Sequence, residues 1–485
     1  MSIIQGNSKT SAAGYTIDQS IRFNDNDSAY LYRTPSSASN RRTWTLSYWI
    51  KRANLGGFMN TFDARLDGGN YAKFQFHSGD YLQFLAETGG GGAYNLATTR
   101  LFRDPSAWYH IVLAVDTTQS TAADRVKIYV NGTQETSFIS GSYPAQNYDT
   151  FVNTTNGHAL AGNFGGAAFL DGYMAEINFV DGQQLDPSSF GEVNSDTGQW
   201  IAKKYSGSYG TNGFYITGED SADLGADYSG NGNDFTSSGL TSADQMSDSP
   251  TNNYCTWNPL QTGTNITSIS DGNLVLSGTS GAATKWMSLG TMPVSSGKWY
   301  YEITSGGARI GAGFTTSGSL TQANLNTGPV DVAAETFVIT NGGQIYYGTT
   351  NSGNTAPAFG SGVTMGFALD ADAGKAWVTV NGSDWADSSS GTSGDPTDGS
   401  NPTWTQTIGT PVQPLCGDTS GGSFVTLATA NFGQSAFAYT PPTGYKAWNT
   451  ANLPDPAIVD PSAYFQPTLY VGNGTAIGSG GLEVN

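Results

Sequence analysis

The acidic side chains that could act as a catalytic pair lie mainly in one strand-like run. Hydrolysis of a glycosidic bond uses two carboxyl groups that flank the bond, about 5–5.5 Å apart in retaining enzymes. Alternate residues of a strand share one face and lie about 6.6 Å apart along the chain. In the run from Glu176 to Asp181, the position that shares a face with Glu176 holds an amide, Asn178. We therefore interpret this run as a structural strand and predict no catalytic residue.

Oxygen-rich side chains gather in two turn-like stretches that resemble parts of a calcium ligand set. Calcium prefers carboxylate and carbonyl oxygens, but Asp and Asn also favour turns through hydrogen bonds to their own backbone. Neither stretch has the full spacing of a known calcium loop. The sequence predicts no cofactor and leaves a structural calcium ion open at one of two places: Asp25 and Asp27, or Asp223, Asp227, Asn231 and Asp234.

Aromatic side chains in turn-rich segments are the candidates for sugar binding. A sugar ring packs on an exposed aromatic face, with Asn, Asp or Gln nearby to bind its hydroxyl groups. The candidates are Tyr94, Tyr143, Trp385 and Trp404, of which Trp385 follows Asn381-Gly382. Because Trp and Tyr are highly or moderately buried on average, packing in the core is the alternative for each of them.

Signatures of other catalytic sites are absent from the sequence. There is no His-Glu-x-x-His zinc motif, no Gly-x-Ser-x-Gly nucleophile elbow and no Gly-Lys-Ser/Thr phosphate loop. Of the three histidines, His110 stands in the apolar stretch 108–115 and is predicted to be a hydrogen-bonded core residue. Cys255 and Cys416 are far apart, so we expect two free thiols and no disulfide framework.

The charge balance limits the class of partner. Twenty Lys and Arg residues stand against 39 Asp and Glu, which gives a net charge of −19. Nucleic-acid binding needs a basic surface to displace counterions from phosphates, so we expect no nucleic-acid partner. No secretory leader and no run of 18 apolar residues is present, so we expect no export signal and no membrane insertion.

The composition indicates the elements that must position these candidates. Charged residues are 12% of the chain, against about 25% in an average domain. Aromatics are also 12%, and 64 of the 485 residues are Gly. Alternating strand runs stand at 44–50, 126–130 and 174–180, and the second of these ends at Asn131-Gly132, a strong hairpin signal. These features exclude a helical bundle and predict an all-β protein of short strands and tight turns.

The same pattern divides the chain into two antiparallel β-sandwich domains. We predict an N-terminal segment at 1–14, a first sandwich at 15–205, a loop-rich connector at 206–251, a second sandwich at 252–448 and a C-terminal segment at 449–485. Both blocks use one device: an apolar strand that ends in Asp, a turn, an alternating strand, and then Asn-Gly. The two copies run from Asp116 to Gly132 and from Asp370 to Gly382.

The strand order of the first block resembles the laminin-G-like, concanavalin-type lectin fold, a jelly-roll sandwich. The motifs that carry the resemblance are residues 44–51, 108–111, 129–132 and 169–177. The second block resembles a SPRY domain through residues 297–303, 366–382 and 431–445. Some glucanases share the concanavalin-type fold and use a Glu-x-Asp-x-x-Glu run, in which Asn178 would replace the middle acid.

The pairing of these two blocks resembles virion structural proteins of marine tailed phages. The resemblance implies a non-enzymatic structural protein on the particle surface, most simply an outward-facing fibre or appendage that binds host-surface glycan or protein. The alternative is a head decoration protein that packs on other virion proteins, and a third option is a polysaccharide depolymerase.

The two ends of the chain are the expected attachment sites. Residues 1–14 are mostly polar, and such a terminus is disordered unless a partner holds it. Residues 449–485, which include the apolar group around Tyr464 and Leu469, resemble the opening of a further region. We therefore expect other virion proteins as partners and a homo-oligomer, because multivalency raises the avidity of weak sites.

Overall fold

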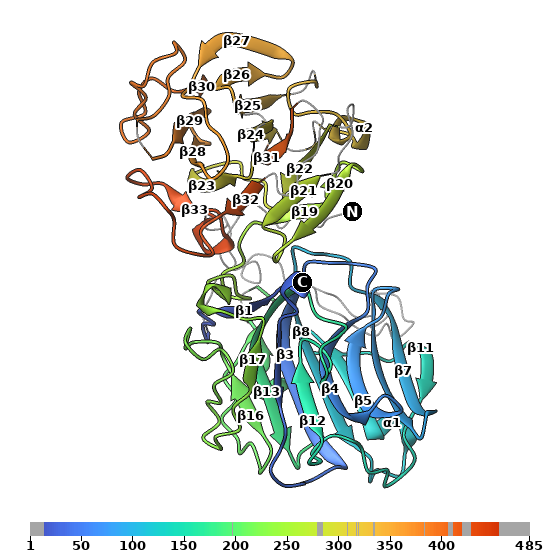
Figure 1. Cartoon of the computed structure of the whole chain (residues 1–485). Helices are drawn as coiled ribbons and strands as arrows, with labels where there is room; N and C mark the ends of the chain where they lie inside the picture. Colours follow the sequence, from blue (N-terminus) through green and yellow to red (C-terminus); the bar gives the residue numbers. More distant parts are fainter. Residues whose placement is uncertain are drawn as a thin grey trace, which may run out of the picture.

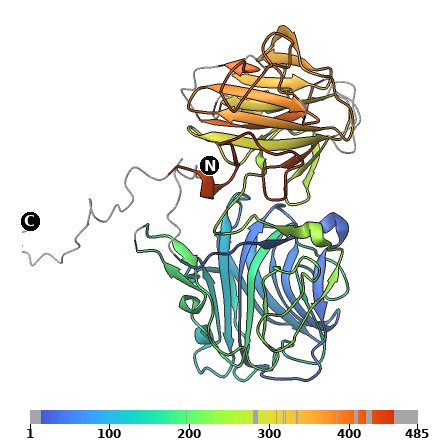
Figure 2. The same ribbon diagram turned by 90° about the vertical axis from the view of Figure 1, so that its left-hand side faces the viewer.

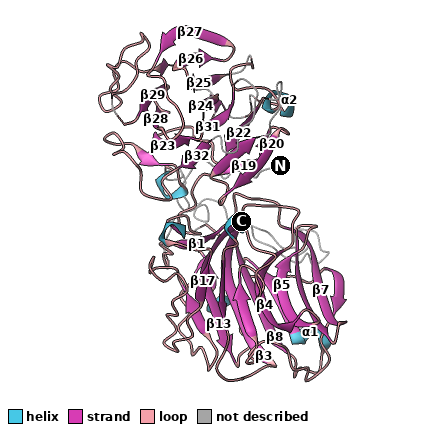
Figure 3. Cartoon of the chain, in the orientation of Figure 1, coloured by secondary structure: helices cyan, strands magenta, loops and turns pink. Residues whose placement is uncertain are grey.

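The computed structural model describes residues 14–454, except 196, 279–284, 308, 317, 319, 333–334, 383, 406–410 and 420–427. Figures 1 and 2 show two lobes, each made of antiparallel sheets packed face to face. Strands dominate in Figure 3, and the two α-helices of the described residues, α1 (Ala122–Arg125) and α2 (Gln322–Leu325), are single turns. The predicted all-β sandwich architecture is confirmed.

The first lobe contains two large sheets, which we call sheet 1 and sheet 2. In spatial order, sheet 1 consists of β10 (Thr133–Gln134), β9 (Val126–Val130), β8 (Trp108–Asp116), β3 (Thr43–Arg52), β13 (Gly172–Asp181), β1 (Ser20–Phe23) and β18 (Gln245–Met246), with β16 (Phe214–Ile216) also paired to β13. Sheet 2 consists of β11 (Phe138–Ser142), β7 (Gly91–Leu101), β6 (Tyr81–Thr88), β5 (Asn70–Phe76), β4 (Met59–Asp67), β12 (Gly157–Leu160), β2 (Tyr30–Arg33) and β17 (Thr236–Ser238).

Alternation along each strand builds the core between sheets 1 and 2. Trp44, Leu46 and Tyr48 point inward from β3 and are fully buried. They face a layer of aromatic side chains from sheet 2, including Phe62 and Phe84, whose rings lie 6.4 and 5.9 Å from the Trp44 ring. Such aromatic side chains each bury about 150–250 Å² and dominate the packing energy.

The outer face of sheet 1 is covered, which explains why β8 reads as a continuous apolar run. Val112 and Ala114 point away from the main core and pack with Phe190 and Val180 in a separate buried cluster. The covering segment includes η2 (Pro187–Ser189), β14 (Gly191–Val193) and β15 (Trp200–Ala202). Asp186 precedes η2 and Pro187 opens it, the position at which a missing N–H costs no helical hydrogen bond.

Both Asn-Gly turns form as predicted, and the first closes a hairpin. Asn131 and Gly132 have φ of 48° and 78°, which matches the left-handed conformation that a two-residue hairpin turn needs at both positions. Asn381 and Gly382 have φ of 58° and 62°. The first turn joins β9 to β10, and the second follows β29 (Lys375–Val380).

The prediction that residues 206–251 form a loop-rich connector is wrong, because this segment belongs to the first lobe. β16 pairs with β13, β17 pairs with β2, and β18 pairs with β1. The segment also holds η3 (Ser242–Asp244). Gly, Asp and Asn made it look like a loop, but these short strands extend the edges of both sheets, where pairing partners are supplied by distant parts of the chain.

The second lobe repeats the two-sheet arrangement. Sheet 3 consists of β19 (Trp257–Thr262), β22 (Trp286–Gly290), β31 (Val412–Asp418), β24 (Ile310–Thr316), β25 (Thr336–Thr340), β26 (Gln344–Tyr347) and β27 (Thr350–Thr355). Sheet 4 consists of β20 (Ile266–Ser270), β21 (Val275–Gly278), β32 (Ala428–Asn431), β23 (Lys298–Ser305), β28 (Thr364–Asp370), β29 and β30 (Trp404–Thr405), with β33 (Lys446–Ala447) parallel to β23. The remaining short helices are η1 (Asp25–Asp27) and η4 (Thr450–Asn452).

Candidate functional site at the lobe junction

One turn of the second lobe inserts into the end of the first lobe. It joins β20 to β21 through Asp271, Gly272 and Asn273, all three in the left-handed conformation, with φ of 58°, 65° and 64°. Asp and Asn tolerate this conformation better than other side chains. The Tyr173 hydroxyl donates to the Gly272 carbonyl at 2.6 Å, so a side chain of the first lobe binds the backbone of this turn directly.

A second contact of this turn involves a buried carboxyl group, Asp171, which precedes β13. Its Oδ1 accepts from the Gly272 N–H at 3.2 Å, while Oδ2 has no hydrogen-bond partner among the described residues. Burial, together with the nearby charge of Asp25, raises the pKa of Asp171 to about 8. Asp171 is therefore protonated at neutral pH and lies in the joint between the lobes.

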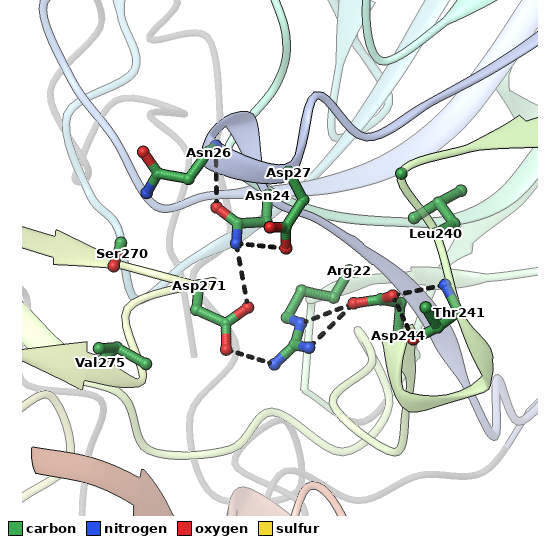
Figure 4. Close-up of a pocket in the computed structure, with 11 residues that line it drawn as sticks. Arg22, Asn24, Asn26, Asp27, Leu240, Thr241, Asp244, Ser270, Asp271 and Val275 are labelled. Atoms are coloured by element: carbon green, nitrogen blue, oxygen red, sulfur yellow. Dashed lines mark hydrogen bonds and ion pairs between the residues drawn. The ribbon is translucent and has the colours of Figure 1, made fainter. Parts of the chain in front are cut away.

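Arg22 bridges the two lobes beside this turn. Ile21 and Phe23 of β1 point into the core, so Arg22 points to the other side of the strand. Its Nη2 lies 2.9 Å from Asp244 Oδ1, and its Nη1 lies 3.1 Å from Asp271 Oδ2. Figure 4 shows the guanidinium between the two carboxylates. Burial opposes its charge, but Asp271 and Asp244 outweigh burial and raise the pKa of Arg22.

Capping interactions hold the carboxylates around Arg22 in place. Thr241 donates through its N–H and its hydroxyl to Asp244 Oδ2, which forms a capping box on η3 and leaves Oδ1 for Arg22. Asn24 caps η1 by accepting from the Asn26 N–H, and its Nδ2 donates to Asp27 Oδ2 at 2.8 Å. The side chains are thus oriented by local backbone geometry before any ligand arrives.

These residues surround an open cavity of about 690 Å³ between the lobes. The lining is Arg22, Asn24, Asn26, Asp27, Gly239, Leu240, Thr241, Asp244, Ser270, Asp271 and Val275. Amide, carboxylate and hydroxyl groups of both lobes converge on it, beside two apolar side chains, Leu240 and Val275 (Figure 4). Such a set can donate to and accept from the hydroxyl groups of a ligand that also has an apolar face.

Comparison with known families finds a similarity within the first lobe, whose two facing sheets carry part of this cavity. Residues 24–187 match the laminin G family of the concanavalin A-like lectin/glucanases superfamily. We call the first lobe the lectin-type lobe from here on. Comparison with curated proteins found no match.

Solved structures similar to this chain include three lectin-like or SPRY proteins. Domains LG4–5 of the mouse laminin α1 chain are 12% identical, cover 93% of this chain and 90% of their own, and give a TM-score of 0.28. The SPRY domain of human HERC1 is 13% identical over 37% of this chain and 99% of its own, with a TM-score of 0.29. A putative carbohydrate binding protein from Bacteroides ovatus is 15% identical over 46% and 58%, with a TM-score of 0.28.

Two of the four aromatic candidates for sugar binding are core residues. Tyr94 is 2% exposed in the core of the lectin-type lobe, and Trp404 is 1% exposed in the core of the second lobe. Trp404 stacks on Phe337 with ring centroids 5.1 Å apart. Neither offers a face to a sugar, so these two predictions are wrong: both side chains sit on the inward face of their strands.

The other two aromatic candidates are half-buried and lie in different lobes. Tyr143 packs edge-on against Phe138 in the lectin-type lobe, and Trp385 packs against Tyr300 in the second lobe. Neither lines the junction cavity. The structure therefore does not bring the four candidates together, and a role of Tyr143 or Trp385 in sugar binding stays a prediction.

The candidate calcium ligands at 223–234 make hydrogen bonds within and beside their turn. Asp227 accepts from the N–H groups of Tyr215, Ser229 and Asn233, and Asp234 accepts from the N–H of Asp227. Asp223 accepts from the Gly225 N–H, and Asn231 donates to the carbonyls of Gly210 and Gly213. Within the described ranges no group of three or more His, Cys, Asp or Glu side chains is placed to hold a metal ion. A structural calcium ion at this stretch stays a prediction.

Asp25 and Asp27 lie next to each other in η1, at the lobe junction. Each accepts from an amide: Asp25 from Asn54 at 3.4 Å and Asp27 from Asn24 at 2.8 Å. Two carboxylates with amide neighbours leave room for further oxygen ligands. A structural calcium ion at Asp25 and Asp27 stays a prediction.

The Glu176–Asp181 run has no catalytic pair. Glu176 lies in a bulge of β13 with φ of 51°, and its Oε1 accepts from the hydroxyls of Tyr15 and Tyr215. Burial raises its pKa. Asn178 accepts from Tyr209, and Asp181 accepts from the Asn212 N–H at 3.0 Å. Glu176, Asn178 and Asp181 are thus each hydrogen-bonded to a distant residue of the first lobe.

The histidine and cysteine predictions agree with the geometry. His110 is 1% exposed; its Nδ1 accepts from Trp200 Nε1 and its Nε2 contacts Ser47 Oγ, both at 2.9 Å. The accepting Nδ1 fixes the neutral tautomer, and burial lowers the pKa of His110 to about 3. Cys255 and Cys416 are buried and free, and burial raises the pKa of Cys255 to about 11.

The residues of the junction cavity were not among the sequence-based candidates, apart from Asp27. Arg22 and Asp271 are 249 residues apart. The local signals were present: Asp271-Gly272-Asn273 is a turn signal, and Thr241 with Asp244 is a capping box. Each predicts a turn or a helix start, and neither tells which distant residue it meets. Of the predicted attachment segments, 1–14 and 449–485, residues 1–13 and 455–485 lie outside the described residues, and 449–454 include η4. No helix of the described chain is long and apolar enough to cross a membrane.

Proposed function

We propose that this protein is a non-enzymatic glycan-binding protein that holds its ligand in the junction cavity. The observation that carries the proposal is the convergence of Arg22, Asn26, Asp27, Ser270 and Asp271 from both lobes on one 690 Å³ cavity. This cavity adjoins a lobe whose sequence matches a lectin-type family. A cavity of this volume accommodates a ligand of drug size or a short oligosaccharide.

The chemistry of the lining favours a sugar over an anionic metabolite. The only cation of the lining, Arg22, is already paired with the carboxylates of Asp244 and Asp271, so it is not free to neutralise an anionic ligand. Asn26 and Asp27 are exposed, and Asn26 presents a donor and an acceptor at fixed spacing. Neighbouring hydroxyl groups of a pyranose complement such groups, while Leu240 and Val275 can contact its C–H surface.

Binding without turnover is the form of the proposal that the site supports. A glycoside hydrolase needs one protonated and one ionised carboxyl group on opposite sides of the scissile bond. In the cavity the guanidinium of Arg22 lies between the carboxylates of Asp244 and Asp271 and pairs with both, so a scissile bond cannot lie between these two acids. A polysaccharide depolymerase is the enzymatic alternative, and release of reducing sugar would reveal it.

We place this activity on a virion surface, as an outward-facing fibre or appendage of a tailed phage. Support comes from the resemblance of the two-block sequence to such proteins and from the surface, which is acidic and poor in Lys and Arg. Virion proteins would be its partners, with assembly into a homo-oligomer. The alternative is a head decoration protein. Immunogold labelling of purified particles distinguishes the tail from the head.

A glycan array combined with a reducing-sugar assay tests the binding function. We expect retained glycan, no sugar release, and loss of binding in Asn26→Ala and Asp27→Ala, whose exposed side chains can be removed without disturbing the core. The control is Glu192→Ala, an exposed position on β14 outside the cavity. Absence of any bound glycan contradicts the proposal, and sugar release replaces it with the depolymerase.

A further inference from the structure

We propose that the outer face of sheet 2 is a second glycan contact, a strip that binds neutral pyranose units through aromatic rings and side-chain amides. This inference rests on the proposed glycan-binding function and adds a site outside the junction cavity. The strip consists of Phe58, His77 and Tyr81 in one row and of Asn60, Gln75, Gln83 and Asn95 in the next.

Strand register places the three rings side by side. Met59 pairs with Phe76, and Phe76 pairs with Leu82, and all three of these side chains point into the core. Their neighbours Phe58, His77 and Tyr81 must then point to the opposite face, because side chains alternate along a strand. The distances agree: the ring of His77 lies 4.6 Å from the ring of Phe58 and stacks on Tyr81 at 4.4 Å.

The aromatic row is accessible, in contrast to the buried Tyr94 and Trp404. Phe58 is 50% exposed, and His77 and Tyr81 are half-buried. Large apolar side chains at the surface of a soluble protein are informative when they cluster. His77 Nδ1 accepts from the Gly79 N–H, which leaves Nε2 available at the edge of the row as a hydrogen-bonding group.

Hydrogen bonds that all donate in the same direction link three of the side-chain amides in the row beside the rings. Gln75 Nε2 donates to Gln83 Oε1 at 2.7 Å, and Gln83 Nε2 donates to Asn95 Oδ1 at 2.9 Å. Asn95, which is half-buried, ends this chain of hydrogen bonds. Its Nδ2 donates to no partner among the described residues. At the other end, Asn60 and Gln75 are 1% and 2% exposed, and Gln75 Oε1 and both amide atoms of Asn60 have no partner in the described part of the chain. Half-buried Gln83 and Asn95 are therefore the amides that a ligand can reach, while Asn60 and Gln75 are buried with unused hydrogen-bonding capacity.

The charged residues around the strip favour an uncharged ligand. No Asp, Glu, Lys or Arg stands in either row. The charged side chains beside the strip on this face are Asp63, Arg65, Lys73 and Glu87, two of each sign, and Asp63 pairs with Arg65 at 2.6 Å. A strongly charged ligand therefore finds no net counter-charge there. An apolar protein surface, including a second copy of this chain, would bury the accessible amides without partners. A pyranose has a C–H face for the rings and hydroxyl groups for the amides.

The strip lies at the end of sheet 2 that faces the second lobe. Phe58 follows the loop in which the Ala53 carbonyl accepts from Asn273 and Asn54 donates to Asp25. Asp25 belongs to η1, which also contributes to the junction cavity. The two sites therefore share one end of the lectin-type lobe, and a glycan chain of several units has both within one surface.

Isothermal titration of the full chain with cellohexaose and maltohexaose, and with hexagalacturonic acid as an anionic probe, tests the strip. We expect the neutral hexasaccharides to bind more tightly than the anionic one, and Phe58→Ala and Tyr81→Ala to raise the Kd at least fivefold. Phe58→Leu keeps the apolar volume without the ring face and should weaken binding as well. Tyr228→Ala, an exposed ring elsewhere, is the control and should stay within twofold.

The outcomes separate this inference from the proposed function. If the protein binds glycan and the Phe58 and Tyr81 variants bind like the unaltered chain, the strip is refuted while the junction cavity stands. Preference for hexagalacturonic acid also refutes it. If Phe58→Ala abolishes self-association in sedimentation and leaves glycan binding intact, the face is a copy-to-copy interface. If no glycan binds at all, both proposals fail together.

Discussion

The ammonium group of Lys51 lies 2.8 Å from the carboxylate of Asp248, and both side chains are at most 1% exposed. Lys51 comes from β3 of the lectin-type lobe, and Asp248 comes from the segment that leads into the second lobe. The Asn253 side chain and the Tyr254 carbonyl accept the other two hydrogen bonds of the ammonium group. All three donors of Lys51 are therefore used to fix the path of the chain between the lobes.

Removing the charge of Lys51 should destabilise this joint strongly. We expect Lys51→Met to lower the free energy of unfolding by about 3–5 kcal/mol, because the buried carboxylate of Asp248 loses its cation. Urea denaturation followed by tryptophan fluorescence measures the change. The matched control is Arg42→Met, whose partner Asp149 and own side chain are over 40% exposed, and we expect it to change the free energy of unfolding far less than Lys51→Met. Equal effects of the two variants would contradict this account.

Stability should fall as the pH rises through the titration of Asp171. The pKa of this carboxyl is about 8 in the folded chain and near 3.8 when exposed, so between these values the folded state holds a proton that the unfolded state has lost. The free energy of unfolding should therefore decrease with rising pH by up to about 1.4 kcal/mol per pH unit, and the loss is complete above pH 8.

The Asp171→Asn variant isolates this contribution. Asn keeps an oxygen that can accept from the Gly272 N–H but does not titrate. The difference in unfolding free energy between the variant and the unaltered chain should grow in favour of the variant from pH 5 to pH 9. A difference that is flat over this range would show that Asp171 does not titrate there.

The buried histidines have the opposite effect on the pH dependence of stability: at acid pH they make the free energy of unfolding rise with pH. Burial lowers the pKa of His110 to about 3 and that of His158 to about 4. The unfolded chain binds protons at these residues near pH 6.5, so stability is fully present above that value and is lost as the pH falls toward the folded-state pKa values. Each should contribute up to about 1.4 kcal/mol per pH unit. The His158→Gln and His110→Gln variants should each show a shallower acid slope in urea denaturation, and an unchanged slope would contradict the prediction.

The first Asn-Gly turn should not tolerate a side chain at its glycine. Gly132 has a positive φ, and a Cβ there would meet the ring of Trp200, whose indole N–H is bonded to His110. We expect Gly132→Ala to lower the free energy of unfolding by about 2–4 kcal/mol. Gly230→Ala, with φ of 88° and open space around the added atom, reports the backbone cost alone, about 1–2 kcal/mol. If Gly132→Ala lowers the free energy of unfolding no more than Gly230→Ala does, contact with the Trp200 ring is excluded as the cause of the loss.

Features that depend on neighbours in the chain were predictable. The alternation in β3 and β13 and the two Asn-Gly turns are local, because side-chain direction in a strand and backbone φ in a tight turn depend on a few consecutive residues. His110 could be recognised as a core residue for the same reason. The burial of Tyr94 was also accessible in principle, since it shares its strand face with Leu96, two positions later.

Features that depend on distant pairing were not predictable from one sequence. The strands of 206–251 are too short to show periodicity, and their pairing with β1, β2 and β13 makes them part of the first lobe. The strip on sheet 2 required the register of three strands, because a shift of one residue would have turned Phe58, His77 and Tyr81 inward.

The sequence by itself determined the all-β class, the hairpins and the division into two blocks, because composition and short-range patterns are sufficient for these. Only the tertiary structure decided where the candidate site lies. Arg22, Asp244 and Asp271 each belong to an ordinary strand or turn, and they come together as a candidate site when the β20–β21 turn docks onto the lectin-type lobe. The physical reason is that a cavity is formed by surfaces hundreds of residues apart, whose meeting depends on packing free energy and not on any local pattern.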